Sequence, residues 1–88
     1  MALFLDVHTF EGGITIDDVV RARLADLRIQ PGYRVRYLRY WVCEASGKVF
    51  CLVEAPSAIA AATVHLEAHG LVAQQVFTVQ PMHDHIAS

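Results

Sequence analysis

The sequence predicts an α+β fold in which a four-stranded antiparallel sheet carries two helices on one face. Segments with the two-residue alternation of strands and segments with helical spacing follow one another in the order βαββαβ. Residues 44–47, between the two middle strands, form a turn short enough for a hairpin. Neither a linker nor a low-complexity segment divides the chain, so we expect one domain over residues 1–80 and a flexible tail over 81–88. This element order is that of the split βαβ, or ferredoxin-like, arrangement.

Segments rich in β-branched and aromatic residues predict the four strands, at residues 3–10, 34–43, 48–54 and 74–80. The first strand alternates between two faces, one carrying Leu3, Leu5 and Val7 and the other Phe4, Asp6 and His8. Pairing across the hairpin predicts three opposed pairs: Cys43 with Lys48, Tyr40 with Cys51, and Trp41 with Phe50.

Two helices complete the pattern. Thr15 begins the first in a Thr-x-x-Asp capping pattern with Asp18, and a Gln-Pro-Gly segment ends it at residues 30–32. Its expected core-facing stripe is Ile16, Val20, Leu24 and Leu27, and the side expected to face solvent carries Arg21, Asp26 and Arg28. The second helix begins with Pro56 or Ser57 and ends at Gly70.

The helices leave one sheet face open. The more apolar face should meet them, and it consists of Leu38, Tyr40, Val42, Val49, Cys51 and Val53. The open face mixes aromatic and charged residues, and Phe4, Asp6 and His8 are expected to join it. Such a mixture is typical of a dimer contact or a ligand pocket. Its candidate residues are Tyr37, Arg39, Trp41 and Phe50.

Composition favours an oligomer and excludes two classes of partner. Hydrophobic residues make up 55% of the chain and charged residues 18%, so a second buried face, in a homodimer, is expected over a compact monomer with a weakly charged surface. A net charge of −2 provides no basic surface for nucleic acid. No apolar run approaches the ~20 residues of a membrane span, and no secretion signal is evident. Two cysteines without such a signal are expected to stay reduced, in the cytoplasm.

Element lengths bring one thiol and three imidazoles to the same end of the domain. The second helix and the third strand each span about 20 Å, so His65 and His69 return to the level of Cys51. The end of the first strand, at His8, lies at the same edge because that strand runs antiparallel to the third. Imidazole with thiolate suits zinc, nickel, copper or iron.

Each candidate ligand also has a purely structural interpretation. His69 is favourable at a helix C-terminus, and His65 can be hydrogen-bonded at the edge of the core. Asp6 can bind an ion beside His8, perform acid–base chemistry or pair with Arg39. The His-x-Glu-x-His spacing is not the protease motif His-Glu-x-x-His, because two residues along a helix point to different sides.

The chain resembles a family of small bacterial ferredoxin-like proteins of unknown function that includes a nickel-binding actinobacterial protein. The resemblance covers residues 3–80 and is carried by Phe-Leu-Asp-Val-His at 4–8, Arg-Tyr-Trp-Val at 39–42, and the longer runs at 47–56 and 64–73. It implies a homodimer whose members can bind nickel, without an established catalytic activity. The chain departs from the family at Cys43 and at Gln74-Gln75, where relatives are more acidic.

These observations favour a cytoplasmic, homodimeric metal-binding protein that sequesters or delivers an ion rather than catalysing a reaction. The resemblance implies Ni²⁺, with Zn²⁺, Cu²⁺ or Co²⁺ as alternatives, and the candidate ligands are Cys51, His65, His69, His8 and Asp6. One alternative is a cofactor-free enzyme of the dimeric α+β barrel type, a monooxygenase or isomerase, with an open-face pocket formed by Asp6, His8, Tyr37, Arg39 and Trp41. A purely structural interaction module is a third hypothesis.

Overall fold

The computed structural model describes residues 1–82. Along the chain lie β1 (Ala2–Thr9), α1 (Ile16–Ile29), the short 3₁₀ helix η1 (Gln30–Tyr33), β2 (Arg36–Cys43), β3 (Lys48–Ala55), α2 (Ala58–Ala68) and β4 (Gln75–Val79). The βαββαβ order predicted from the sequence is therefore confirmed. Most of the predicted tail, residues 83–88, lies outside the described part of the chain.

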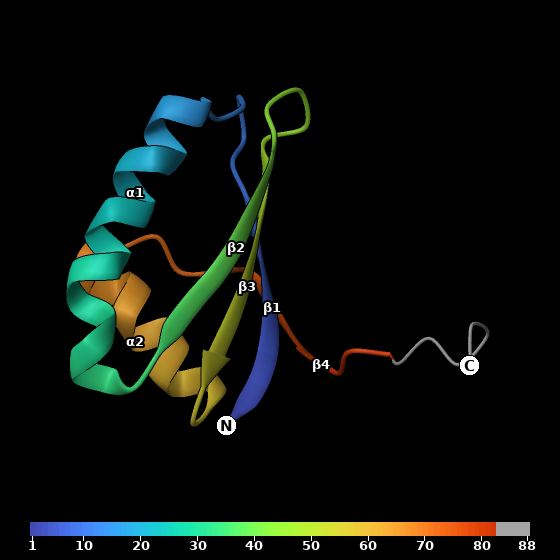
Figure 1. Cartoon of the computed structure of the whole chain (residues 1–88). Helices are drawn as coiled ribbons and strands as arrows, with labels where there is room; N and C mark the ends of the chain where they lie inside the picture. The colour runs from blue at the N-terminus through green and yellow to red at the C-terminus, as the bar shows by residue number, and fades with distance from the viewer. Residues whose placement is uncertain (83–88) are drawn as a thin grey trace.

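The four strands form one antiparallel sheet in the order β2-β3-β1-β4. Both helices lie on the same side of this sheet, and β4 is the edge strand farther from them (Figure 1). The two central strands, β1 and β3, pair over their full length, from Ala2 with Ala55 to Thr9 with Lys48. Residues on β1 and β3 that face the helices are therefore enclosed between the two layers.

The helix termini follow the predicted capping chemistry. The Thr15 hydroxyl accepts a hydrogen bond from the Asp18 backbone N–H, and the Ser57 hydroxyl accepts one from Ala60 N–H, each at 3.1 Å. After α2 the chain turns at Gly70, whose φ of +78° is readily adopted by glycine. The Gly70 N–H donates to His65 O at 2.9 Å and so closes the helix C-terminus.

The hairpin has the predicted pairing at its turn, but a bulge changes the faces farther along β2. Cys43 pairs with Lys48, Tyr40 with Cys51 and Trp41 with Phe50. Beyond them, Arg39 pairs with Leu52 and Tyr37 with Val53, so Leu38 is an extra residue in β2. An extra residue reverses the alternation on one side of it. Tyr37, expected on the open face, is therefore buried on the helix side, and Leu38, expected toward the helices, is exposed.

The predicted faces of β1 were wrong. Phe4, Asp6 and His8 pair with Val53, Cys51 and Val49, which face the helices, and all three are buried. Hydropathy favours the opposite assignment, because the observed one places two polar residues, Asp6 and His8, in the core. The polar side chains are tolerated there because other buried polar groups surround them. They join a core formed mainly by Val19, Val35, Tyr37, Val53, Ala61 and Val64.

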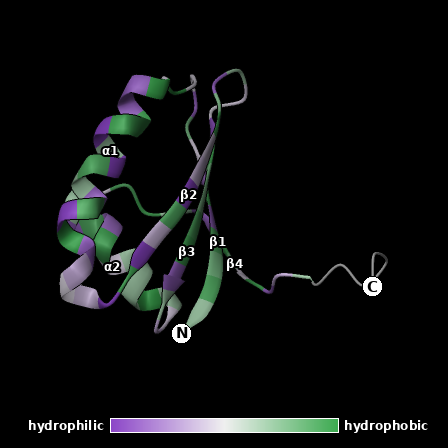
Figure 2. Cartoon of the chain, in the orientation of Figure 1, coloured by the Kyte–Doolittle hydropathy of each residue, from purple (hydrophilic) through white to green (hydrophobic). Residues whose placement is uncertain are grey.

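Helix α1 is also turned about its axis relative to the prediction. Leu24, from the expected core stripe, is 56% exposed, whereas Asp26, expected to face solvent, is 0% exposed. The buried side follows the spacing of Val19, Ala22 and Asp26, at i, i+3 and i+7. Figure 2 shows polar and apolar residues in alternation along α1, so its hydropathy alone does not fix one buried side.

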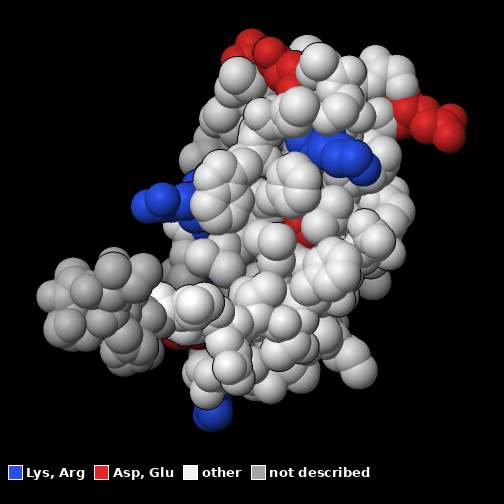
Figure 3. Space-filling model, turned by 90° about the vertical axis from the view of Figure 1, so that its right-hand side faces the viewer, with Lys and Arg blue, Asp and Glu red and all other residues white. Residues whose placement is uncertain are grey.

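The sheet face away from the helices is broad and sparsely charged. Viewed from that side, uncharged surface extends between isolated Lys, Arg, Asp and Glu side chains (Figure 3). Trp41 on β2 and Phe77 on β4 are each nearly half exposed, at 45% and 48%. Arg39 and Phe50 lie on this same face as Trp41, so three of the four open-face candidates lie where they were predicted, and Tyr37 does not.

Candidate metal centre

Six side chains from both layers meet between the sheet and the helices. They are Asp6 and His8 from β1, Asp26 from α1, Cys51 from β3, His65 from α2 and His69 at its C-terminal cap. The β1–β3 register places Asp6 directly opposite Cys51. The first five of these side chains are buried, and His69 is partly buried.

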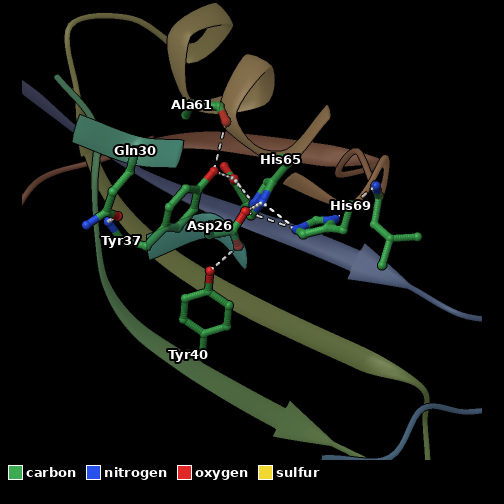
Figure 4. Close-up of polar contacts among 9 residues, drawn as sticks. Asp26, Gln30, Tyr37, Tyr40, Ala61, His65 and His69 are labelled. Atoms are coloured by element: carbon green, nitrogen blue, oxygen red, sulfur yellow. Dashed lines mark hydrogen bonds and ion pairs between the residues drawn. The ribbon is translucent and has the colours of Figure 1, made fainter. Parts of the chain in front are cut away.

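His65 is at the centre of the group, between two carboxylates. Its Nδ1 lies 2.9 Å from Asp26 Oδ1, and its Nε2 lies 3.2 Å from Asp6 Oδ2 (Figure 4). Burial by itself lowers the pKa of His65, but its hydrogen bond to Asp26 and its ionic contact with Asp6 outweigh it and raise that pKa to about 11. In the metal-free protein His65 is therefore an imidazolium ion.

Asp26 accepts hydrogen bonds at both of its carboxylate oxygens. Tyr40 OH donates to Oδ2, and His69 Nε2 lies 3.0 Å from Oδ1. The backbone N–H of Leu71 donates to His69 Nδ1 at 3.0 Å, so His69 carries a ring proton on Nε2, which faces Asp26. Burial raises the pKa of Asp26, but the bonds from His65 and His69 prevail and lower it to about 2. Asp26 is therefore a carboxylate with its partners already in place.

Tyr37 connects Asp6 to the second helix. Its hydroxyl lies 2.9 Å from the carbonyl oxygen of Ala61 and 3.3 Å from Asp6 Oδ2. Burial, together with the negative charges of Asp6 and Asp26, raises the pKa of Tyr37, so its hydroxyl remains protonated. The β2 bulge, which turns Tyr37 inward, thus supplies a partner for Asp6.

Two triads have ligand atoms that all lie within 4.8 Å of one another: His8, Cys51 and His65, and Asp26, His65 and His69. In the first triad, the Nε2 atoms of His8 and His65 are buried without a hydrogen-bond partner, because the contact of His65 Nε2 with Asp6 lacks hydrogen-bond geometry. In the second triad, His65 Nδ1 and His69 Nε2 already bond to Asp26 Oδ1. Unused bonding capacity is therefore concentrated at the first triad.

The donors of the first triad fit a late divalent metal. Two imidazole nitrogens and a thiolate are ligands that zinc, nickel, cobalt and copper accept, and that calcium and magnesium do not prefer. Burial, followed by the charge of His65, lowers the pKa of His8 to about 4, so its imidazole is neutral and ready to coordinate. Burial raises the pKa of the Cys51 thiol, and the His65 ring is an imidazolium in the metal-free protein, so metal binding requires the loss of one proton from each.

The structure brings together the five candidate ligands that the sequence indicated, Asp6, His8, Cys51, His65 and His69. Asp6, His8 and Tyr37 face the helices, whereas Arg39 and Trp41 lie on the open sheet face. These five side chains therefore do not form one pocket, and the open-face pocket of the alternative enzyme hypothesis is wrong. Sequence reasoning missed Asp26, although its spacing from Val19 and Ala22 was an available signal.

Comparison with known proteins gives the family. The model for the nickel responsive protein SCO4226-like family matches residues 4–79, most of the chain. The chain belongs to the SCO4226-like family. The crystal structure of SCO4226 from Streptomyces coelicolor A3(2) has a TM-score of 0.84 to this SCO4226-like chain at 38% identity, and the match covers 93% of this chain and 100% of that one. No curated protein matches the chain.

These findings confirm the family resemblance predicted from the sequence and, with it, the ferredoxin-like fold of this SCO4226-like protein. Within the described residues, no helix is long and apolar enough to cross a membrane.

Proposed function

We propose that this SCO4226-like protein binds a late divalent metal, with nickel as the first candidate, through His8, Cys51 and His65. The observation that carries the proposal is the buried cluster of His8, Cys51 and His65, in which His8 Nε2 has no hydrogen-bond partner and His65 Nε2 makes an ionic contact with Asp6 at 3.2 Å but no hydrogen bond. The nickel-responsive family favours nickel among the metals that this donor set accepts. Asp6, whose Oδ1 atom also lacks a partner and whose Oδ2 lies 3.2 Å from His65 Nε2, is an additional oxygen donor.

The surrounding groups support this assignment. A histidine that binds metal through one ring nitrogen usually donates its other N–H to a carboxylate, which fixes the orientation of the ring. Asp26 Oδ1, 2.9 Å from His65 Nδ1, is placed for that role. His69 and Tyr40 hold Asp26 in turn, so we assign His69 to orientation of the site rather than to direct ligation.

A binding role, in sequestration or delivery, is consistent with the metal-free structure. In that state the His65 imidazolium is already paired with Asp6 and Asp26. The fold therefore does not depend on the ion to neutralise a buried charge. Both Cys43 and Cys51 are free, which favours a reducing compartment such as the cytoplasm.

Nickel calorimetry on four proteins tests the proposed ligands. Native protein is expected to bind one Ni²⁺ per chain in this site and to show a thiolate-to-nickel absorption band. Cys51→Ala should abolish the band, and His65→Ala should greatly weaken binding. Cys43→Ala is the matched control, because Cys43 is exposed and lies outside the cluster. A background of His83→Ala with His85→Ala removes the C-terminal histidines as competing ligands. Unchanged nickel affinity in both Cys51→Ala and His65→Ala would refute the site.

We also propose that two copies associate through the open sheet face. This face is sparsely charged (Figure 3). It exposes Trp41 and Phe77. A dimer would cover an apolar area that a soluble monomer rarely exposes. Light scattering after gel filtration measures the mass in solution, and a single species at the monomer mass would exclude the dimer.

A further inference from the structure

The three proposed ligands are almost closed off from solvent. His8 is 4% exposed, and Cys51 and His65 are each 1% exposed. They come from β1, β3 and α2, so the sheet covers one side of the cluster and the helix layer covers the other. An ion that binds here must therefore reach the cluster through a passage between these elements.

A small cavity leads from the protein surface to this cluster. Its volume is about 60 Å³, which at roughly 10–15 Å³ for one water corresponds to about four to six waters. All three proposed ligands line the cavity, and so do the exposed side chains of Asp18 and Leu71. One continuous cavity thus contacts both solvent-facing residues and the buried cluster.

Exposure decreases along the side of α1 that lines the cavity. Asp18 is exposed, Ala22 is partly buried and Asp26 is 0% exposed. These residues stand at i, i+4 and i+8, so they lie on one side of the helix. Eight residues of helix span about 12 Å. The cavity therefore follows α1 from its exposed first turn inward to Asp26.

The chain at the end of α2 shows the same gradient. Leu71 is exposed, His69 is partly buried and His65 is buried. The backbone N–H of Leu71 donates to His69 Nδ1, and His69 Nε2 lies 3.0 Å from Asp26 Oδ1 (Figure 4). These contacts follow one another from the surface to the buried cluster. Both elements therefore place the mouth of the cavity at Asp18 and Leu71 and its floor at Asp26 and His65.

We propose that this cavity is the route by which a metal ion enters from solvent and reaches Cys51. The inference deepens the proposed function and rests on it. Asp18 lies at the mouth and Asp26 at the floor, and mostly apolar side chains such as Ala22 form the wall between them. An apolar wall offers an ion no ligand, so the width of this stretch sets the rate of passage rather than the binding affinity.

Rapid mixing of Ni²⁺ with the metal-free, full-length protein tests the route. Ala22→Leu narrows the cavity at a residue that is not a proposed ligand. Because an ion enters and leaves by the same route, the variant should slow association and dissociation by the same factor, about tenfold, with the dissociation constant unchanged. Leu71→Ala widens the mouth and should raise both rates equally. Leu66→Ala, the matched control, removes an exposed leucine outside the cavity and should change neither rate.

Alkylation of Cys51 by iodoacetamide gives a second measurement that needs no metal. The protein is kept in a chelator, and peptide mass spectrometry separates Cys51 from the exposed Cys43. Ala22→Leu should slow the alkylation of Cys51, Leu71→Ala should speed it, and Cys43 should react equally in all variants. A destabilised fold would speed the reaction of Cys51 in Ala22→Leu, so a slower reaction distinguishes a narrowed cavity from unfolding.

The outcomes separate this route from the proposed function. Native Ni²⁺ rates in both Ala22→Leu and Leu71→Ala would overturn the route and leave the metal site intact. An altered dissociation constant with an unchanged association rate would also overturn it. Absence of any Ni²⁺ binding that depends on Cys51 would refute the metal site, and with it the use of the route by an ion. If Ala22→Leu does not fold, the comparison of Leu71→Ala with Leu66→Ala decides, because both replace an exposed leucine by alanine.

Discussion

His65 Nδ1 lies 2.9 Å from Asp26 Oδ1, although 39 residues separate them in the chain and both are almost fully buried. This contact joins α2 to α1 directly above the sheet. It also joins the two candidate triads, because His65 belongs to both. The stability of the fold and the properties of the metal centre therefore depend on the same pair.

Removing His65 should destabilise the metal-free protein strongly. His65→Ala leaves Asp6 and Asp26 buried without their common cation, and breaking a buried pair in this way costs about 3–5 kcal/mol in the free energy of unfolding. Urea denaturation in the presence of a chelator measures the loss. Asp17→Asn, at an exposed carboxylate of α1, is the control and should change the value by less than about 0.5 kcal/mol. A similar small effect for both variants would contradict the central role of His65.

Stability should fall as the pH rises above neutrality. The pKa of His65 is raised from 6.5 to about 11 on folding, so its contribution is fully present below pH 6.5 and is lost as the pH rises through 11. The pKa of His8 is lowered to about 4 on folding, so this residue acts in a separate pH range. Its contribution to the free energy of unfolding is present above pH 6.5 and is lost as the pH falls toward 4. Urea midpoints of the metal-free protein, measured between pH 6.5 and 11, give the slope of stability against pH. His65→Gln should flatten it, and an equal slope in the variant would assign the effect to other groups.

The residues around Asp26 should tune metal affinity without being ligands. Asp26→Asn weakens the acceptor for His65 Nδ1–H and is expected to lower nickel affinity about 10–100-fold. Tyr40→Phe, which removes the donor to Asp26 Oδ2, should act in the same direction. The matched control is Tyr33→Phe, since Tyr33 OH donates to Glu67 at the surface. Competition with a chelator of known affinity measures the nickel affinity of each variant. Equal losses in Tyr40→Phe and Tyr33→Phe would argue against the proposed role of the hydrogen bonds around Asp26.

A charge on the open sheet face should separate the dimer. Trp41→Glu places a carboxylate where two copies are proposed to meet, and burying an unpaired charge is unfavourable. Sedimentation analysis is expected to show the monomer mass for this variant. Ile59→Glu serves as the control, because Ile59 on α2 is 78% exposed and lies on the helix side. A dimer that survives Trp41→Glu but dissociates with Ile59→Glu would place the interface on the helices.

Features set by local chemistry were predictable from the sequence. The helix caps at Thr15 and Ser57, the hairpin turn and its pairing of Tyr40 with Cys51 all depend on residues close together in the chain. Element lengths alone also brought His65 near Cys51. These features follow from the fixed rise per residue of strands and helices.

Which side of an element is buried was predicted less well. The sequence pattern placed Asp6 and His8 on the open sheet face and Asp26 toward solvent, because an isolated polar group is costly to bury in the core. That cost is offset only when partners arrive from other elements, and here they arrive from α2 and β2. The bulge at Leu38 is a second case, since no turn residue in the sequence marks it.

The sequence by itself determined the order of the elements, the fold class, the family and the end of the domain at which a thiol and several imidazoles gather. Only the tertiary structure decided that Asp26 belongs to this group, that Tyr37 faces inward and that His8 and His65 keep unpartnered nitrogens beside Cys51. The physical reason is that secondary structure depends on local periodicity, whereas a buried polar group is stabilised by partners distant in the sequence.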